Sequence, residues 1–323
     1  MVGPGPAPAG PGAFLVAARR RRARSSGDGG AGPAIFKHRL LPYLLLLPQL
    51  AVVATFFLWP TVKAVIEAFQ QTNAFGLGSR FSGFQNFVDA VANGNYLQSI
   101  EVTLVFAALT TVLGMAIGLF LATQVEQVGR GRAVYRALFV WTYAVPGAVA
   151  GALWLFLFQP DLGPGARLLG QLGVKWNFAL HGTQAMGLIV ALTVWQQSAY
   201  NYLFYTAAMQ AVPGEVLDAA SVDGAGKLAR FWRMTFPLLS PTTFFLSVMN
   251  VLYAFFSSFA VIDIVTQGGP AGATNTLVYQ LYRDGFQNAD TGLAGAETVV
   301  LVLIAGVFTV VQFRMFNRRV HYR

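Results

Sequence analysis

Residues 212–241 read VPGEVLDAASVDGAGKLARFWRMTFPLLSP and form a polar island between two long apolar runs. The island contains three acidic and three basic residues: Glu215, Asp218, Asp223, Lys227, Arg230 and Arg233. Pro213 suits the first turn of a helix, and Glu215 places negative charge near the positive end of that helix. A second short helix is predicted over residues 228–236, and Pro237 is expected to end or kink it. The pattern therefore predicts two short helices within a polar loop.

Two interpretations of this loop are open from the residues alone. It fits an ordinary amphipathic loop at a membrane surface. It also fits a docking element, because the small side chains of Ala219 and Ala220 let a partner come close. The neighbouring acidic residues would then offer charge-assisted hydrogen bonds to that partner.

The composition of the chain indicates an integral membrane protein. Of the 323 residues, 55% are hydrophobic and only 11% are charged, and the mean hydropathy is +0.54, whereas soluble domains are about 25% charged. The chain has no cysteine, which excludes disulfides and thiolate metal sites within it. His38, His181 and His321 are far apart in sequence, so no metal site is predicted.

Six apolar runs are long enough to cross a bilayer, which takes about 20 residues. They cover residues 40–62, 102–125, 137–158, a segment within 182–214, 241–265 and 295–316. Pro48, Pro60 and Pro146 are expected to kink their helices, which implies a packed bundle because lipid offers no hydrogen-bond partners. Gly114 and Gly118 form a GxxxG pattern that allows close helix contact. The predicted fold class is an all-α integral membrane protein with six transmembrane helices.

The positions of lysine and arginine predict how the spans are oriented. Seventeen of the 22 lie in the two ends, the second connection or residues 212–241: Arg19, Arg20, Arg21, Arg22, Arg24, Lys37, Arg39, Arg130, Arg132, Arg136, Lys227, Arg230, Arg233, Arg314, Arg318, Arg319 and Arg323. The alternate connections hold the other five, which are Lys63, Arg80, Arg167, Lys175 and Arg283. Both termini and the loop 212–241 are therefore predicted to be cytoplasmic. This distribution explains the net charge of +9 without nucleic acid as a partner.

The N-terminal residues 1–39 are predicted to form a disordered, basic cytoplasmic tail, and residues 40–323 the transmembrane domain. The tail is rich in Gly, Pro and Ala around an arginine block, a composition that buries no core. An arginine block before an apolar run also occurs in export signals. Here the apolar run is too long for a signal, and no convincing cleavage site follows it.

Uncharged polar residues gather in the fourth and fifth predicted spans. Buried amides and phenols need hydrogen-bond partners that lipid does not supply, so these side chains are expected to face the bundle interior. On a helix, Gln197, Tyr200 and Asn201 share one face, with Gln196 adjacent. Two interpretations are open: the polar residues hold helices together, or they line a path for a polar solute. The candidate path residues are Gln196, Gln197, Tyr200, Asn201, Asn250 and Tyr253.

Signals of several other functions are missing from the sequence. Gly226-Lys227 is followed by Leu228, and no glycine stands five positions before Gly226, so the phosphate-binding loop of an ATPase is absent. The sequence shows no chain of buried carboxylates for a proton-coupled secondary transporter. It also shows no nucleophile–base pair for a membrane-embedded enzyme.

Residues 218–237 resemble the cytoplasmic coupling loop of permease subunits of binding-protein-dependent ABC importers. The family's pattern is Glu-Ala-Ala, three residues, Gly, and about nine residues later a hydrophobic–x–x–Pro end. Asp218, Ala219, Ala220, Gly224, Met234 and Pro237 occupy those positions, and Asp223-Gly224-Ala225 matches the carbohydrate-importing branch. The sequence departs from the family at Asp218, which replaces its Glu, and at Met234 and Phe236, which replace its Ile and Leu. The resemblance implies that Asp218, Ala219, Ala220, Asp223, Gly224, Ala225 and Pro237 couple the permease to an ATPase.

The resemblance extends from about residue 40 to the C-terminus. Gly83-Phe84-x-Asn86-Phe87 is similar to the family's first outward loop, and Gly268-Gly269-Pro270 to its last. Four further fragments together resemble the first permease subunit of sn-glycerol-3-phosphate importers: Val194-Trp195-x-Gln197-x-x-Tyr200-Asn201, Leu252-Tyr253-Ala254-Phe255-Phe256, Val261-Ile262-Asp263 and Val310-Val311-Gln312-Phe313-Arg314.

This resemblance implies a type I ABC importer permease in the inner membrane. The implied partners are a second permease subunit, two copies of a cytoplasmic ATPase and an external solute-binding protein. ATP and Mg²⁺ would bind to the ATPase, and no cofactor to this chain. The implied solute is sn-glycerol-3-phosphate or a glycerophosphodiester. A neutral sugar or oligosaccharide is the alternative, because no cation lies within the spans between Arg136 and Lys227.

Overall fold

The computed structural model describes residue 3 and residues 41–72, 78–126, 131–215, 224 and 226–317. The chain divides into two compact units, Met1–Pro60 and Thr61–Arg323.

The described part of the first unit is helical and apolar. It comprises α2 (Leu41–Val53), the π-helical turn η1 (Ala54–Leu58) and the first residues of α3 (Trp59–Glu67). The π-helical turn lies just before Pro60, whose ring would clash with the carbonyl four residues earlier in a regular helix. Leu47 and Phe56 are more than half exposed, and a helix that is hydrophobic all round needs lipid or other helices around it.

The second unit is a helical bundle with one small sheet. The remaining elements, in chain order, are β1 (Gln70–Thr72), β2 (Ser79–Phe81), α4 (Gln85–Ala92), α5 (Gly94–Glu126), α6 (Arg132–Tyr143), α7 (Gly147–Phe158), α8 (Pro164–Gln171), α9 (Gly182–Gln210), α11 (Lys227–Arg230), η2 (Phe231–Thr235), α12 (Phe236–Leu238), α13 (Ser240–Leu252), η3 (Tyr253–Ser257), α14 (Phe259–Val265), α15 (Leu277–Tyr282), η4 (Arg283–Gln287) and α16 (Thr291–Asn317). The short sheet departs from the all-α prediction within the described residues.

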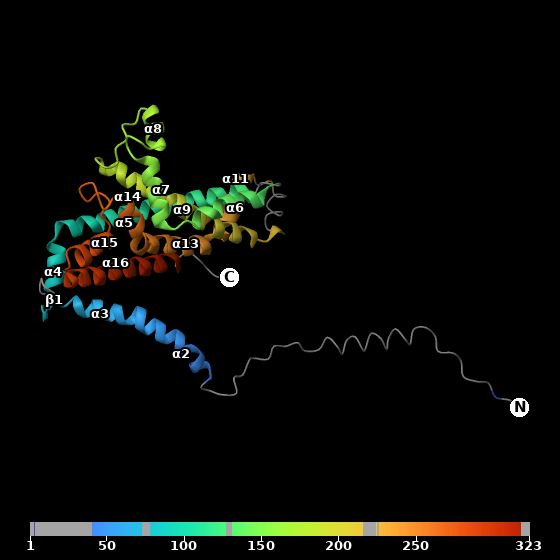
Figure 1. Ribbon diagram of the computed structural model, residues 1–323. Helices are drawn as coiled ribbons and strands as arrows, with labels where there is room; N and C mark the ends of the chain where they lie inside the picture. Colours follow the sequence, from blue (N-terminus) through green and yellow to red (C-terminus); the bar gives the residue numbers. More distant parts are fainter. Residues whose placement is uncertain are drawn as a thin grey trace. The chain divides into compact units, whose positions relative to one another are not determined.

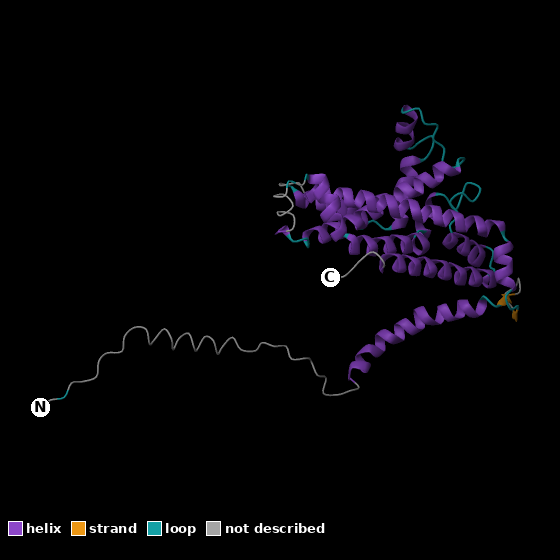
Figure 2. Cartoon of the chain, turned by 180° about the vertical axis from the view of Figure 1, so that it is seen from behind, coloured by secondary structure: helices purple, strands orange, loops and turns teal. Residues whose placement is uncertain are grey.

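Helices α5 and α9 form the centre of the bundle. They pack along each other, α6 and α13 cover them, and α16 lies against α13 (Figures 1 and 2). Two hydrophobic clusters result, one around Phe106, Ile189 and Phe255 and one around Tyr202 and Leu246. The short helix α8 stands away from these packed helices (Figure 1). The bundle therefore places α9, the most polar of the long helices, among its neighbours.

The Gly83-Phe84-x-Asn86-Phe87 motif stabilises the small sheet. Strands β1 and β2 pair antiparallel, with Gln71 opposite Arg80. The buried Asn86 donates from its amide Nδ2 to the carbonyl oxygens of Ala68 and Gln70, both at 2.9 Å. Gly83 has a φ of +61°, a left-handed conformation that favours glycine. The motif thus fixes the chain just before α4.

Three helices of the described residues are long and apolar enough to cross a membrane: Tyr43–Glu67, Gly94–Glu126 and Thr291–Phe316. They correspond to the first, second and sixth predicted spans. Two bent pairs, Ala133–Tyr143 with Gly147–Phe158 and Lys227–Leu238 with Ser240–Ser257, raise the number to five. The third predicted span, residues 137–158, contains the expected kink at Pro146, which is a break where α6 and α7 meet at 96°.

Helix α9 is not among these candidates although it has 29 residues. Its glutamine, asparagine and serine side chains lower its hydropathy. Many of its side chains are buried against neighbouring helices, including Leu192, Asn201 and Tyr202. Hydropathy alone is therefore a poor test of whether a helix surrounded by protein crosses a membrane.

Candidate functional site

Most of the predicted coupling residues lie outside the described residues. Asp218, Ala219, Ala220, Asp223 and Ala225 are in this group, and their roles stay predictions. Gly224 is described and has a φ of +77°. That left-handed conformation explains why glycine stands at this position.

The second predicted helix of the loop extends slightly further than expected. Residues Lys227–Leu238 form α11, η2 and α12, and the chain then bends by 67° into α13. Pro237 lies inside this continuous helical segment, just after the π-helical turn η2, where its ring and missing N–H disturb the helical hydrogen bonding. The bend follows at Leu239. The bend therefore lies two residues after Pro237, and not at Pro237 as predicted.

Three of the predicted path residues form a buried amide cluster. Asn250 Nδ2 donates to Asn201 Oδ1 at 2.8 Å, and Asn201 Nδ2 donates to Asn250 Oδ1 at 3.3 Å. Gln197 Nε2 reaches the same Asn250 oxygen at 3.4 Å. The cluster links α9 to α13, and it satisfies amide groups that lipid would leave without partners.

The glycine pair of α5 lies directly against this cluster. A Cβ on Gly114 would stand 3.3 Å from Asn201 Nδ2, and a Cβ on Gly118 would stand 2.5 Å from the Asn201 Cβ. The GxxxG pattern therefore brings α5 into close contact with α9, as the sequence predicts.

Gln196 has a different role from its neighbour Gln197. Its Nε2 donates to the carbonyl oxygen of Val145 at 2.9 Å. Val145 lies in the break between α6 and α7, where carbonyl groups lose their helical partners. Gln196 thus compensates for the break that Pro146 introduces.

The other predicted path residues line a hollow of about 480 Å³. Its wall includes Gln197, Tyr200 and Tyr253, together with Tyr143 and Ser257. The rings of Tyr143 and Tyr200 are 5.4 Å apart. Met249, Leu252 and Phe256 complete the wall. A few hydroxyl and amide groups thus lie among apolar side chains, a lining that is typical of small-molecule sites.

The predicted path residues are therefore divided between two environments. Gln196, Asn201 and Asn250 hold helices together, whereas Tyr200 and Tyr253 face the hollow and Gln197 touches both. Tyr143 and Ser257 were missed by sequence reasoning. The signal for Tyr143 was its place just before the helix break at Pro146, which turns its backbone toward α9.

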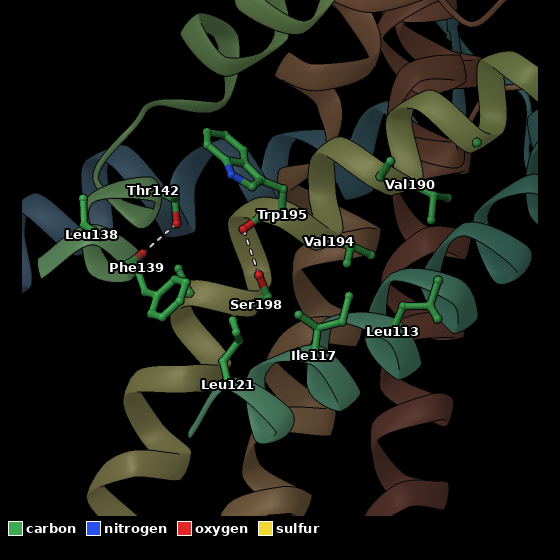
Figure 3. Close-up of a pocket in the computed structure, with 13 residues that line it drawn as sticks. Leu113, Ile117, Leu121, Leu138, Phe139, Thr142, Val190, Val194, Trp195 and Ser198 are labelled. Carbon is green, nitrogen blue, oxygen red and sulfur yellow. Dashed lines mark hydrogen bonds between the residues drawn. The ribbon is translucent and has the colours of Figure 1, made fainter. Parts of the chain in front are cut away.

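A larger hollow of about 830 Å³ lies between α5, α6 and α9. Figure 3 shows Leu113, Ile117 and Leu121 from α5 around it, with Phe139 from α6 and Val194 from α9. Two hydroxyls at its wall already donate to their own helices: Thr142 to Phe139 O at 2.7 Å and Ser198 to Trp195 O at 3.0 Å. This hollow suits an apolar occupant and not a polar solute.

Comparison with known proteins gives a consistent result. The family described as "Binding-protein-dependent transport system inner membrane component" matches residues 114–322. The "sn-glycerol-3-phosphate transport system permease protein UgpA" of Brucella abortus biovar 1 (strain 9-941) is 48% identical over 287 residues, covering 89% of this chain and 98% of that protein. The UgpA of Rhizobium meliloti (strain 1021) is 47% identical over 288 residues, with the same coverage.

Solved structures agree in fold. A chain of the crystal structure of "a bacterial ABC transporter involved in the import of the acidic polysaccharide alginate" gives a TM-score of 0.76 at 20% identity, covering 87% of this chain and 96% of that one. A chain of the alginate transporter "in complex with alginate pentasaccharide-bound periplasmic protein" gives a TM-score of 0.75 at 20% identity. The match covers 86% of this chain and 94% of that chain. At this identity the likeness concerns the arrangement of the helices.

Proposed function

Because this chain belongs to the family of binding-protein-dependent transport system inner membrane components, we propose that it is the permease subunit of an importer for sn-glycerol-3-phosphate or glycerophosphodiesters. The observation that carries the proposal is its near-50% identity to permeases named for sn-glycerol-3-phosphate transport, along almost their whole length. The hollow beside Tyr200 and Tyr253 supports it, since hydroxyl and amide groups suit a small polyol.

The proposed topology has six membrane spans and two cytoplasmic ends. Helix α9 counts as the fourth span, because the amides of Gln196 and Asn201 are buried in the bundle and donate hydrogen bonds to neighbouring segments instead of facing lipid. The bent pair α6–α7 counts as the third. The basic residues on the two ends and on residues 212–241 support this orientation.

The proposed partners are a second permease subunit, two copies of a cytoplasmic ATPase and an external solute-binding protein. ATP and Mg²⁺ are assigned to the ATPase, because this sequence has no phosphate-binding loop. No cofactor is assigned to this chain. The family description itself supports dependence on a binding protein.

The proposed mechanism is alternating access. Closure of the ATPase dimer pushes on the loop 212–241 around Gly224. The 67° bend after α12 passes this movement to α13, which carries Asn250 and part of the hollow wall. The spans then open outward and accept the solute from the binding protein.

A neutral sugar is the second candidate solute. The observation that favours it is the lining of the path hollow, which has three tyrosines and no charged side chain. Aromatic faces stack on sugar rings without any need for charge.

ATPase activity of the purified complex in lipid tests the proposal, with binding protein and candidate solutes added in turn. We expect stimulation by sn-glycerol-3-phosphate or a glycerophosphodiester. Stimulation by a sugar alone would keep the transporter class and overturn the solute. Purification without any ATPase subunit would overturn the ATP-driven mechanism.

A further inference from the structure

A charged hollow of about 380 Å³ lies between the end of α14 and the beginning of η4. It is lined by Asp263, Gln267, Tyr279, Arg283 and Gln287, together with the glycines Gly268, Gly269 and Gly272. None of these residues belongs to the predicted coupling loop or to the path hollow. Its volume lies within the ~300–1,000 Å³ of small-molecule sites.

The wall of this hollow is firmly held. Thr274 Oγ1 donates to the carbonyl oxygen of Gly269 at 2.8 Å and contacts Thr266 Oγ1 at 2.7 Å. Gly268 has a φ of +76°, and a Cβ there would stand 2.8 Å from the Tyr279 ring. Gln98 Nε2 of α5 donates to the carbonyl oxygen of Ala271 at 3.3 Å. The hollow is therefore built into the packed outer end of the bundle.

Two opposite charges line the hollow without pairing with each other. Arg283 and Asp263 make no ion pair within the part of the chain that the structure describes, where Lys63 and Glu67 form a salt bridge at 3.4 Å. The guanidinium and the carboxylate are thus both available to a third group. The path hollow, in contrast, has no charged lining.

We propose that this hollow is an entry site for a polyol phosphate, in which Arg283 binds the phosphate and Asp263 accepts hydrogen bonds from the hydroxyl groups. A guanidinium binds phosphate through two parallel hydrogen bonds. A carboxylate accepts from hydroxyls, and the amides of Gln267 and Gln287 complete the polar wall. This inference rests on the proposed solute, and it provides the cation that the spans lack.

Tyr279 adds a neutral hydrogen-bond donor to the site. Burial raises the pKa of its hydroxyl, and the nearby negative charge of Asp263 raises this pKa further. Arg283 acts in the opposite direction. The hydroxyl therefore keeps its proton at neutral pH and is able to donate to a phosphate oxygen.

The test uses the complete complex in proteoliposomes, with binding protein outside and sn-glycerol-3-phosphate as the probe. Arg283→Gln should lower uptake at saturating binding protein by about tenfold or more, as expected for a lost charge-assisted hydrogen bond. Arg283→Lys keeps the charge without the two-pronged geometry and should recover part of the uptake. Asp263→Asn should reduce uptake by a smaller factor.

Arg167→Gln is the matched control. Arg167 lies in α8, outside the hollow, so its loss removes the same charge from the outer loops. Uptake within about twofold of the wild type is expected, since exposed charges contribute little.

Each other outcome is decisive. Unchanged uptake by a well-inserted Arg283→Gln variant would overturn the entry site and leave the proposed function standing. Recovery of that variant as the binding protein concentration rises would make Arg283 a docking contact, which also overturns it. No sn-glycerol-3-phosphate uptake by the wild type would overturn the solute and the entry site together.

Discussion

In the loop 212–241, which we propose to couple to the ATPase, Gly224 shows the clearest requirement for one residue type. With a φ of +77°, it occupies a conformation that other L residues disfavour by about 1–2 kcal/mol. A Cβ on it would meet nothing within 4 Å in the described residues. The requirement is therefore the backbone conformation and not space.

Gly224→Pro should abolish uptake while leaving membrane insertion intact, because proline fixes φ near −65°. Gly226→Ala is the matched control, since Gly226 has a φ of −62° and equally open surroundings. Uptake and the amount of membrane-inserted protein are measured together. Normal uptake in a well-expressed Gly224→Pro variant would reject the coupling assignment.

The amide pair Asn201–Asn250 allows the two interpretations of the polar residues to be separated. Asn250→Leu leaves the buried Asn201 amide without its partner, which should cost about 1–3 kcal/mol of stability. Replacing both residues by leucine removes the unpaired Asn201 amide and should restore part of that stability, while Gln197 still loses its long contact with Asn250.

Thermal unfolding and uptake, measured on the single and double variants, distinguish the roles. If the pair only holds helices together, the double variant should recover uptake along with stability. A stable double variant without uptake would show that the amides serve the solute path. No loss of stability in Asn250→Leu would contradict the hydrogen-bond pair itself.

At the scale of elements, the sequence was informative where one local property decided the outcome. Apolar length located the helices now seen at Tyr43–Glu67, Gly94–Glu126 and Thr291–Phe316. The GxxxG pattern predicted a close helix contact of α5, and the structure identifies α9 as the partner. The 96° break at Pro146 was foreseen only as a kink. The carbonyl of Val145 in this break accepts a hydrogen bond from Gln196, which lies 51 residues away along the chain.

In the candidate site, too, local sequence patterns did not predict contacts between distant residues. Sequence spacing placed Gln197, Tyr200 and Asn201 on one helical face. It did not reveal that Asn201 would be fully buried beneath Gly118 while Tyr200 faces a hollow. Which polar residue binds a neighbour and which faces a hollow is decided by contacts between α5, α9 and α13, and these are not local in sequence.

The packing of α5 on α9 predicts a strong effect of Gly118→Val. The new Cβ would stand 2.5 Å from the Asn201 Cβ and 2.9 Å from the backbone nitrogen of Tyr202. Backbone shifts of this kind typically cost about 1–3 kcal/mol or more, so the melting temperature should fall clearly. Gly187→Ala in α9 is the control, because a Cβ there meets nothing within 4 Å in the described residues. Equal melting temperatures would contradict the close contact.

At the scale of the whole molecule, much apolar surface is uncovered. Phe120, Trp141 and Phe156 are each more than 60% exposed, which suits a membrane protein whose spans face lipid. The apolar hollow of Figure 3 opens on this surface between α5, α6 and α9. Such uncovered apolar surface on the described residues is what membrane-spanning helices present to lipid.

The membrane topology of the whole molecule depends on whether α9 crosses the membrane. This helix is the one proposed span among the described residues that fails on apolar composition, and it lies between the exposed Lys175 and the exposed Lys227. The chain has no cysteine, so a single introduced cysteine is labelled without background. If α9 crosses the membrane, the two positions lie on opposite sides.

Lys175→Cys should react with a membrane-impermeant maleimide in intact cells, and Lys227→Cys only after permeabilisation. Uptake by each variant serves as the control for a native fold. Labelling of both positions from outside would mean that α9 does not cross and that the loop 212–241 is out of reach of a cytoplasmic ATPase. Labelling of Lys227→Cys alone would invert the molecule, against the positions of its basic residues. Only the expected pattern is compatible with coupling through Gly224, because ATP is hydrolysed on the cytoplasmic side.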